Sequence, residues 1–85
     1  MKIYDDYFFG SIIINLKDIM DEKKISINQM SKLANLRYET VRKYYYNEVY
    51  LLDVDVLSKF CYFLDIDIST LLTYKYENIN EKVHL

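Results

Sequence analysis

The chain has 85 residues and a formal net charge of −2, and 52% of its residues are apolar. This length and composition indicate one small domain with a single hydrophobic core. With one glycine and no proline, the sequence excludes collagen-like repeats and glycine-rich phosphate loops and favours helices. Its single cysteine, Cys61, excludes an internal disulfide, and we expect a buried, inert thiol and a reducing, cytoplasmic location.

Residues 1–10 lack a clear periodicity and are predicted to form an N-terminal extension to a domain over residues 11–74. The extension carries aspartates where a secretory signal needs an apolar run, and no later run approaches the roughly 20 apolar residues that cross a bilayer. Residues 11–14 read SIII, a β-branched segment that indicates a short strand. Asn15 is then a favourable N-cap for a helix that we expect to run from Leu16 to about Lys24.

The second helix is predicted to begin at Ser26, because Gln29 follows three residues later and completes a capping box. It should end near Asn35, which accepts a positive φ more readily than most residues. Its apolar stripe at helical spacing consists of Ile27, Met30, Leu33 and Ala34.

The third helix is expected to begin near Arg37 or Tyr38, to run to about Tyr46 and to stop at Asn47. Arg37 is not a favourable N-cap residue, so the start of this helix has no strong capping signal. The inward side chains are predicted to be Val41, Tyr44 and Tyr45.

Two further helices follow, the fourth capped by Asp53 and the short fifth capped by Asp67. The fourth has the strongest apolar pattern and should supply much of the core, with Val56, Leu57, Phe60, Cys61, Phe63 and Leu64. The fifth carries Ile68, Leu71 and Leu72. Residues 73–76 are suited to pair with residues 11–14 as two edge strands, and residues 75–85 are predicted to form a C-terminal tail.

Residues 26–45 carry the pattern of two short helices that cross steeply after a tight turn. Ser31 is small enough to let the two helix backbones approach each other. Asn35 can adopt the left-handed conformation of the turn, and Val41 is a stiff, β-branched wedge between the helices. The spacing therefore predicts a helix-turn-helix motif.

This order of segments resembles the lambda-repressor-like helix-turn-helix family of the Cro/repressor (XRE) type. The matching text runs from NLKDIMDEKKISINQMSKLANLRYETVRKYY to LLDVDVLSKFCYFLDIDISTLL, roughly residues 15–72. The resemblance implies a compact all-α domain of five helices, here with a small pair of terminal edge strands. It also implies a transcriptional regulator that binds double-stranded DNA sequence-specifically, acts as a homodimer, is not an enzyme and needs no cofactor or metal.

The distribution of charge agrees with a DNA partner. Residues 23–43 contain six basic side chains and one acid, Glu39, giving a net charge of +5, whereas the rest of the chain carries −7. A molecule polarised in this way can bind a polyanion on one face while its other faces repel it.

The resemblance implies that the third helix enters the major groove with its start nearest the bases. Base contacts are then expected from Tyr38, Glu39, Arg42 and Lys43. Phosphate contacts are expected from Asn28, Lys32, Arg37, Tyr46, Lys23 and Lys24. The chain departs from the family at Ile27, where glutamine is frequent, at Asn35, where glycine is usual, and at Arg37, where serine or threonine is usual.

Simpler interpretations remain open for several of these residues. Arg42 and Lys43 could form a solvated helix face, Glu39 could pair with either of them instead of reading a base, and Tyr38 could pack at the turn. The acidity of the chain, together with Ile27 and Glu39, also fits a second function on the same fold. This alternative is a protein-interaction module of antirepressor or antitoxin-like type that binds no DNA.

No catalytic or metal site is expected from the sequence. His84 lies one residue from the end and Cys61 lies in the fourth helix, so one chain cannot assemble a Cys/His nucleophile pair or a zinc cluster from them. For the homodimer, the expected contact is through the termini, where the aromatic residues of the extension are Tyr4, Tyr7, Phe8 and Phe9.

Overall fold

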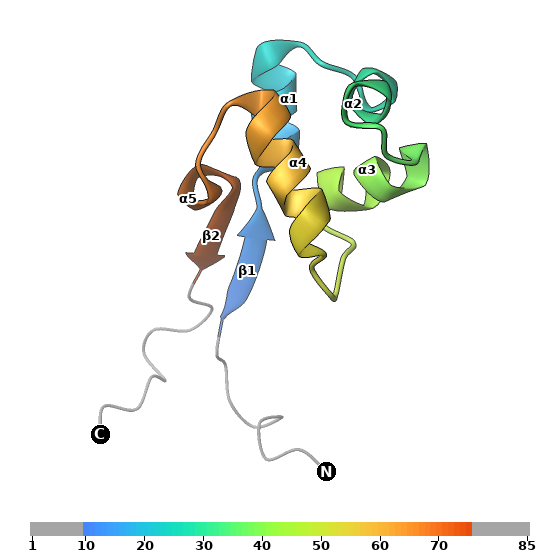
Figure 1. Ribbon diagram of the computed structural model, residues 1–85. Coiled ribbons are helices and arrows are strands. Elements are labelled where there is room, and N and C mark those ends of the chain that lie inside the picture. The colour runs from blue at the N-terminus through green and yellow to red at the C-terminus, as the bar shows by residue number, and fades with distance from the viewer. Residues whose placement is uncertain (1–9, 76–85) are drawn as a thin grey trace, which may run out of the picture.

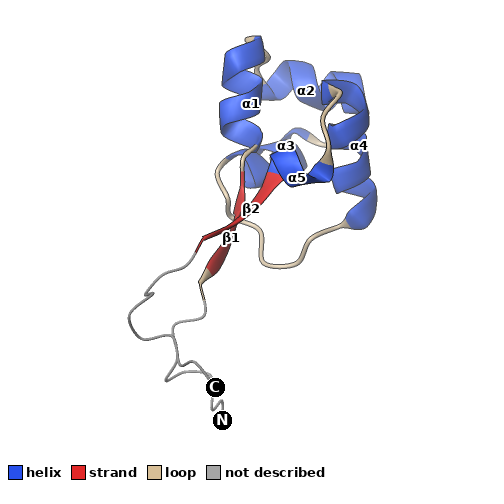
Figure 2. Ribbon diagram, turned by 90° about the vertical axis from the view of Figure 1, so that its left-hand side faces the viewer, coloured by secondary structure: helices blue, strands red, loops and turns tan. Residues whose placement is uncertain are grey.

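Five helices and one pair of antiparallel strands make up residues 10–75, the part of the chain that the computed structural model describes (Figure 1). In chain order the elements are β1 (Ser11–Ile14), α1 (Leu16–Lys23), α2 (Ile27–Ala34), α3 (Tyr38–Tyr45), α4 (Val54–Leu64), α5 (Ile68–Leu71) and β2 (Leu72–Lys75). The helices pack together, and the two strands extend from one end of them (Figure 2). The predicted five-helix fold with a small strand pair is confirmed.

The expectations for Tyr4, Tyr7, Phe8, Phe9 and His84 fall outside the described residues. Within residues 10–75, no helix is both long enough and apolar enough to span a bilayer.

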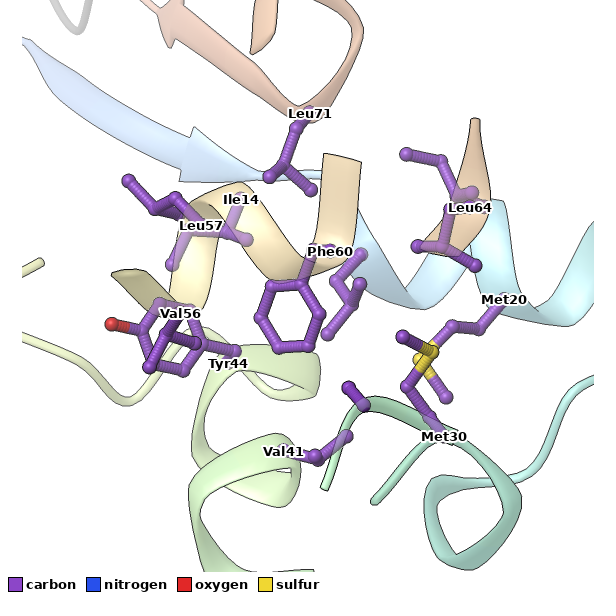
Figure 3. Close-up of a cluster of buried hydrophobic side chains, with 13 residues drawn as sticks. Ile14, Met20, Met30, Val41, Tyr44, Val56, Leu57, Phe60, Leu64 and Leu71 are labelled. Atoms are coloured by element: carbon purple, nitrogen blue, oxygen red, sulfur yellow. The ribbon is translucent and has the colours of Figure 1, made fainter. Parts of the chain in front are cut away.

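The core is built around Phe60 of α4, whose side chain is fully buried. Its ring meets the ring of Tyr44 from α3 edge to face, with 5.4 Å between the ring centroids. Figure 3 shows how side chains from α1 to α5 and from the end of β1 converge on this pair. The other fully buried large side chains are Leu16, Met20, Met30, Val41, Leu64 and Leu71. Because every helix contributes one apolar face, each helix is oriented by the same small core.

The strand pair joins the two ends of the domain. Ser11 lies opposite Lys75 and Ile14 lies opposite Leu72, so the predicted pairing is confirmed, with β2 beginning one residue earlier than expected. Gly10 precedes β1 with a φ of +83°, and a side chain there would meet the carbonyl oxygen of Lys75 at 2.6 Å. Glycine is therefore required at this position by both the positive φ and the nearby carbonyl of Lys75.

Asn15 does not cap α1, so that expectation was wrong. Its backbone has a φ of −89° and a ψ of 22°, and its side chain makes no capping bond. The side-chain amide instead donates to the carbonyl of Thr70 at 3.1 Å and to the hydroxyl of Thr73 at 2.8 Å. Since β2 and α5 lie beside the start of α1, these partners compete successfully with the local backbone.

The predicted apolar stripes are wider than the faces that the domain buries. Leu33 of α2 is 48% exposed and Phe63 of α4 is 38% exposed, because no other element covers the outer edges of these helices. Cys61 is half-buried instead of fully buried. Asp67 occupies the N-cap position of α5, but its side chain makes no capping bond, whereas Asp53 caps α4 as predicted.

Candidate nucleic-acid interface

The start of α2 is fixed by the predicted capping box. The Ser26 hydroxyl accepts the backbone N–H of Gln29 at 3.1 Å, and the Gln29 side chain accepts the backbone N–H of Ser26 at 2.8 Å. Two of the unpaired N–H groups at the helix start are satisfied in this way. Asn28 is exposed in this first turn, while Ile27, at the position where the family often has glutamine, is half-buried.

The turn between α2 and α3 has the predicted geometry. Asn35 adopts the left-handed conformation with a φ of 55° and a ψ of 49°. Ser31 is only 7% exposed, and its hydroxyl donates to the carbonyl of Asn28 at 2.9 Å. Val41 of α3 is fully buried beside it. The small Ser31 side chain, satisfied within its own helix, therefore lets α3 cross close to α2 (Figure 1).

This crossing divides α3 into an inner and an outer face. Val41 and Tyr44 are buried, whereas Tyr38 is 50% exposed and Tyr46, directly after the helix, is 51% exposed. Lys43 is exposed as well. Arg37 stands at the N-cap position with extended backbone and no capping bond from its side chain, as its residue type led us to expect. The first turn of α3 is consequently available to a ligand, with Tyr38 and Glu39 at its start.

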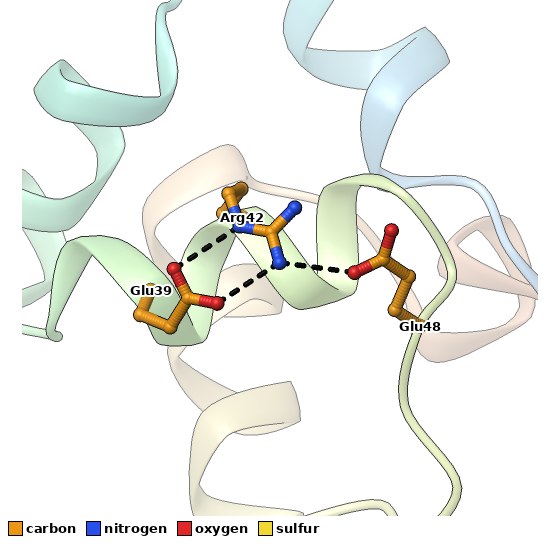
Figure 4. A network of polar contacts seen from close by, with 3 residues as sticks. All are labelled: Glu39, Arg42 and Glu48. Carbon is orange, nitrogen blue, oxygen red and sulfur yellow. Dashed lines mark hydrogen bonds and ion pairs between the residues drawn. The ribbon is translucent and has the colours of Figure 1, made fainter.

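Arg42 is held between two carboxylates (Figure 4). Its Nε donates to Glu39 Oε1 at 3.1 Å, its Nη2 donates to Glu39 Oε2 at 2.9 Å, and Nη2 also donates to Glu48 Oε1 at 3.0 Å. The hydrogen bonds that Arg42 donates, first to Glu39 and then to Glu48, raise the pKa of Arg42, and the bond from Arg42 lowers the pKa of Glu39. Of the alternatives left open for Glu39, the structure shows the local pair with Arg42.

The remaining cations near the motif are not neutralised in this way. Between Lys23 and Lys43, the exposed basic side chains that form no ion pair with a carboxylate are those of Lys23, Lys24, Lys32, Arg37 and Lys43. Lys23 and Lys24 end α1 shortly before α2 begins, Lys32 lies on α2 and Lys43 on α3. The net positive charge of this region therefore comes from these side chains more than from Arg42, because two carboxylates offset the charge of Arg42.

Tyr45 contacts side chains of α1 and so helps to orient α3. Its hydroxyl donates to Asp21 Oδ1 of α1 at 2.6 Å, and Lys17 Nζ contacts the other oxygen of Asp21 at 2.8 Å. The ammonium group of Lys17 also lies 5.5 Å from the centre of the Tyr45 ring. The hydrogen bonds from Lys17 and Tyr45 lower the pKa of Asp21. This cluster fixes the end of α3 against α1.

The loop from residue 46 to residue 53 carries contacts that sequence reasoning missed. Asn47 was expected only as a helix stop, and it has a positive φ of 59°. Its side chain, however, binds the backbone of Ile14 through both amide atoms. Glu48 reaches back to Arg42, and the Tyr44 hydroxyl accepts the N–H of Asp53 at 2.9 Å. The signal for Glu48 was only its sign of charge near Arg42, because six residues and a turn separate them.

A second surface lies between α4 and α5. A groove of about 710 Å³ is lined mainly by apolar side chains, with Asp67 as its charged member: Val54, Leu57, Ser58, Cys61, Tyr62, Ile66, Asp67 and Ile68. Tyr62 is 78% exposed along it. Nothing in the residue set of this groove resembles a catalytic constellation, and residues 10–75 contain no cluster of His, Cys, Asp or Glu that could hold a metal ion.

Comparison with known proteins agrees with this geometry. A search of curated proteins found no significant match to the chain. The family model of the Cro/C1-type HTH DNA-binding domain matches residues 15–77, which is most of the chain and includes α1 to α5. Together with the tight crossing of α2 and α3 at Ser31 and Asn35, this match shows that the chain belongs to the Cro/C1-type helix-turn-helix DNA-binding domain family.

Proposed function

We propose that this protein regulates transcription by binding a specific sequence in double-stranded DNA with α3 in the major groove. One observation carries the proposal. The crossing built on Ser31 and Asn35 buries Val41 and leaves the first turn of α3 exposed. A helix displayed in this way can insert its N-terminal residues between the phosphate backbones.

The proposed base contacts come from the start and outer face of α3. Tyr38 and Glu39 lie in its first turn, where a carboxylate can accept from the amino group of cytosine. Arg42 and Lys43 lie one turn further along, and a guanidinium can donate to the O6 and N7 atoms of guanine. These four residues are the ones that should set the preferred sequence.

The proposed phosphate contacts surround α3. Asn28 and Lys32 are exposed on α2, Arg37 precedes α3, and Tyr46 follows it. Lys23 and Lys24 at the end of α1 add charge near the start of α2. Contacts of this kind fix the register of the protein on the duplex but carry little sequence information.

The test combines a selection from random duplexes with a salt titration. Selected duplexes should share one sequence, and binding through about six cations should weaken by on the order of a thousandfold between 50 and 200 mM salt. Lys32→Ala, at a proposed phosphate contact, should lower the affinity for all sequences and reduce the salt slope by about one. Lys75→Ala, which removes the same charge at the far end of the strand pair, is the matched control and should leave both unchanged.

We also propose that the protein acts as a homodimer, since two copies on one duplex would read two half-sites about 34 Å apart. The strand pair offers a place for this contact, because Ile12 and Tyr74 lie opposite each other and are both exposed next to the N-terminal extension. Light scattering should give a dimer for the full protein and a monomer for the chain without residues 1–10. A dimer of the shortened chain would reject this contact.

A second candidate function is a protein-interaction module on the same fold. The groove between α4 and α5 favours it, because Val54, Tyr62 and Ile68 are exposed apolar side chains in or beside one concave surface. The pairing of Arg42 with two carboxylates also lowers the positive charge of α3. Failure to bind any duplex even at low salt would select this function over DNA binding.

A further inference from the structure

We propose that Glu48 is a specificity-determining positioning residue that occupies the guanine-reading edge of Arg42 until DNA displaces it. The inference rests on the proposed DNA-binding function. It assigns a role to a loop residue that lies outside α3 and was not among the expected contact residues.

The edges of the Arg42 guanidinium are occupied unequally. Arginine has five N–H donors, one on Nε and two on each Nη. Glu39 takes the side edge, because it accepts from both Nε and Nη2 of Arg42. Glu48 accepts the other N–H of Nη2 at 3.0 Å. Figure 4 shows Glu39 and Glu48 on opposite sides of the Arg42 guanidinium, with no dashed line from its other terminal nitrogen to either of them.

The end edge, formed by the two Nη atoms, is therefore half occupied. A bidentate contact with guanine through this edge needs one N–H from each Nη atom. Within residues 10–75, Nη1 of Arg42 has no hydrogen-bond partner, but Nη2 has both of its hydrogens engaged. Glu48 must release Nη2 before Arg42 can bind guanine in this way, whereas Glu39 can stay and hold the guanidinium plane.

Charge makes the release selective. Glu39, Arg42 and Glu48 together carry a net charge of −1, so the carboxylate of Glu48 adds a repulsion toward the phosphates of any duplex. A guanine at the matching position accepts two hydrogen bonds from Arg42, which replace the one hydrogen bond lost to Glu48. A base without the O6 and N7 acceptors accepts fewer, so Glu48 lowers the affinity for unmatched DNA more than for matched DNA.

The experiment is a double-mutant cycle on DNA binding by the full chain, using the selected duplex and a random duplex of equal length. Glu48→Ala should tighten binding to the random duplex by about tenfold and to the selected duplex by about threefold, so the selectivity ratio falls. In the Arg42→Ala background, Glu48→Ala should change either affinity by less than about twofold. Glu22→Ala, which removes an exposed carboxylate from α1, is the control for net charge.

The other outcomes separate the two proposals. An equal gain from Glu48→Ala with and without Arg42, or an equal gain from Glu22→Ala, would overturn the role of Glu48 and leave DNA binding intact. No gain from Glu48→Ala would overturn it as well. If neither the wild type nor any variant binds DNA at low salt, the proposed function itself fails, and this inference fails with it.

Discussion

The side chain of Asn47, which follows α3, is bound at two points to the backbone of Ile14 at the end of β1. The Oδ1 atom of Asn47 accepts the N–H of Ile14 at 2.7 Å, and its Nδ2 donates to the carbonyl of Ile14 at 2.8 Å. The two residues are 33 positions apart, so this pair ties the end of α3 to the strand pair. The Asn47 side chain thereby pairs the backbone N–H and carbonyl groups of Ile14, which have no further strand to bind there.

This relationship predicts different outcomes at two asparagines with positive φ. Asn47→Gly keeps the backbone conformation but loses both hydrogen bonds, so unfolding should become easier by about 2 kcal/mol. Asn35→Gly changes an exposed turn residue with the same conformation and should change the free energy of unfolding by less than about 1 kcal/mol. Urea unfolding of both variants measures the difference. Equal losses would show that the Asn47 side chain contributes little.

Tyr44 should stabilise the domain through its hydroxyl group as well as its ring. The hydroxyl accepts the N–H of Asp53, the residue that caps α4, in a partly buried position. Tyr44→Phe keeps the ring contact with Phe60 but leaves that N–H unpaired, which should cost about 1 kcal/mol in thermal or urea unfolding. Tyr46→Phe is the control, because the exposed Tyr46 hydroxyl makes no hydrogen bond within residues 10–75, and its effect should be near zero. A neutral Tyr44→Phe would mean that water replaces the lost acceptor.

The cluster of Lys17, Asp21 and Tyr45 should make stability depend on acid pH. The pKa of Asp21 is lowered in the folded protein, first by the hydrogen bond from Lys17 and then by that from Tyr45. The contribution of Asp21 is therefore present above its unfolded pKa and is lost as the pH falls from there through the lowered folded pKa. In Tyr45→Phe the folded pKa of Asp21 moves back towards its ordinary value, so less stability should be lost across this range. Carboxyl NMR titration of Asp21 together with unfolding at several pH values checks the sign. An unchanged Asp21 pKa in the variant would contradict it.

Cys61 should react slowly with alkylating reagents. Burial raises the pKa of the Cys61 thiol, with a smaller contribution from the charge of Asp67. Less of the nucleophilic thiolate is then present at pH 8, so iodoacetamide should react at least about threefold more slowly than with glutathione. Mass spectrometry follows the reaction, and the same measurement in denaturant should remove the difference. Since Cys61 lines the groove between α4 and α5, a protein partner seated there should slow the reaction further. A folded-state rate equal to that of glutathione would contradict the expected protection.

The local elements of the domain followed from short stretches of sequence. The capping box of Ser26 and Gln29, the left-handed turn at Asn35 and the cap at Asp53 all depend on residues within a few positions of one another. The helix boundaries were therefore predictable to within one or two residues. The outward position of Lys43 follows from the direction of α3 once Val41 is placed inward, whereas the sequence left open whether Tyr38 packs at the turn.

What the tertiary structure decided is which of these side chains are free and which are already bound. Asn15 binds Thr70 and Thr73 instead of capping its helix, and Glu48 reaches Arg42 across a turn. Leu33, at helical spacing with buried residues, remains exposed because nothing packs over it. Local sequence fixes backbone conformation through steric and hydrogen-bonding preferences over a few residues. The partner of a polar or charged side chain depends on elements brought together from distant positions, and only the packed core determines those.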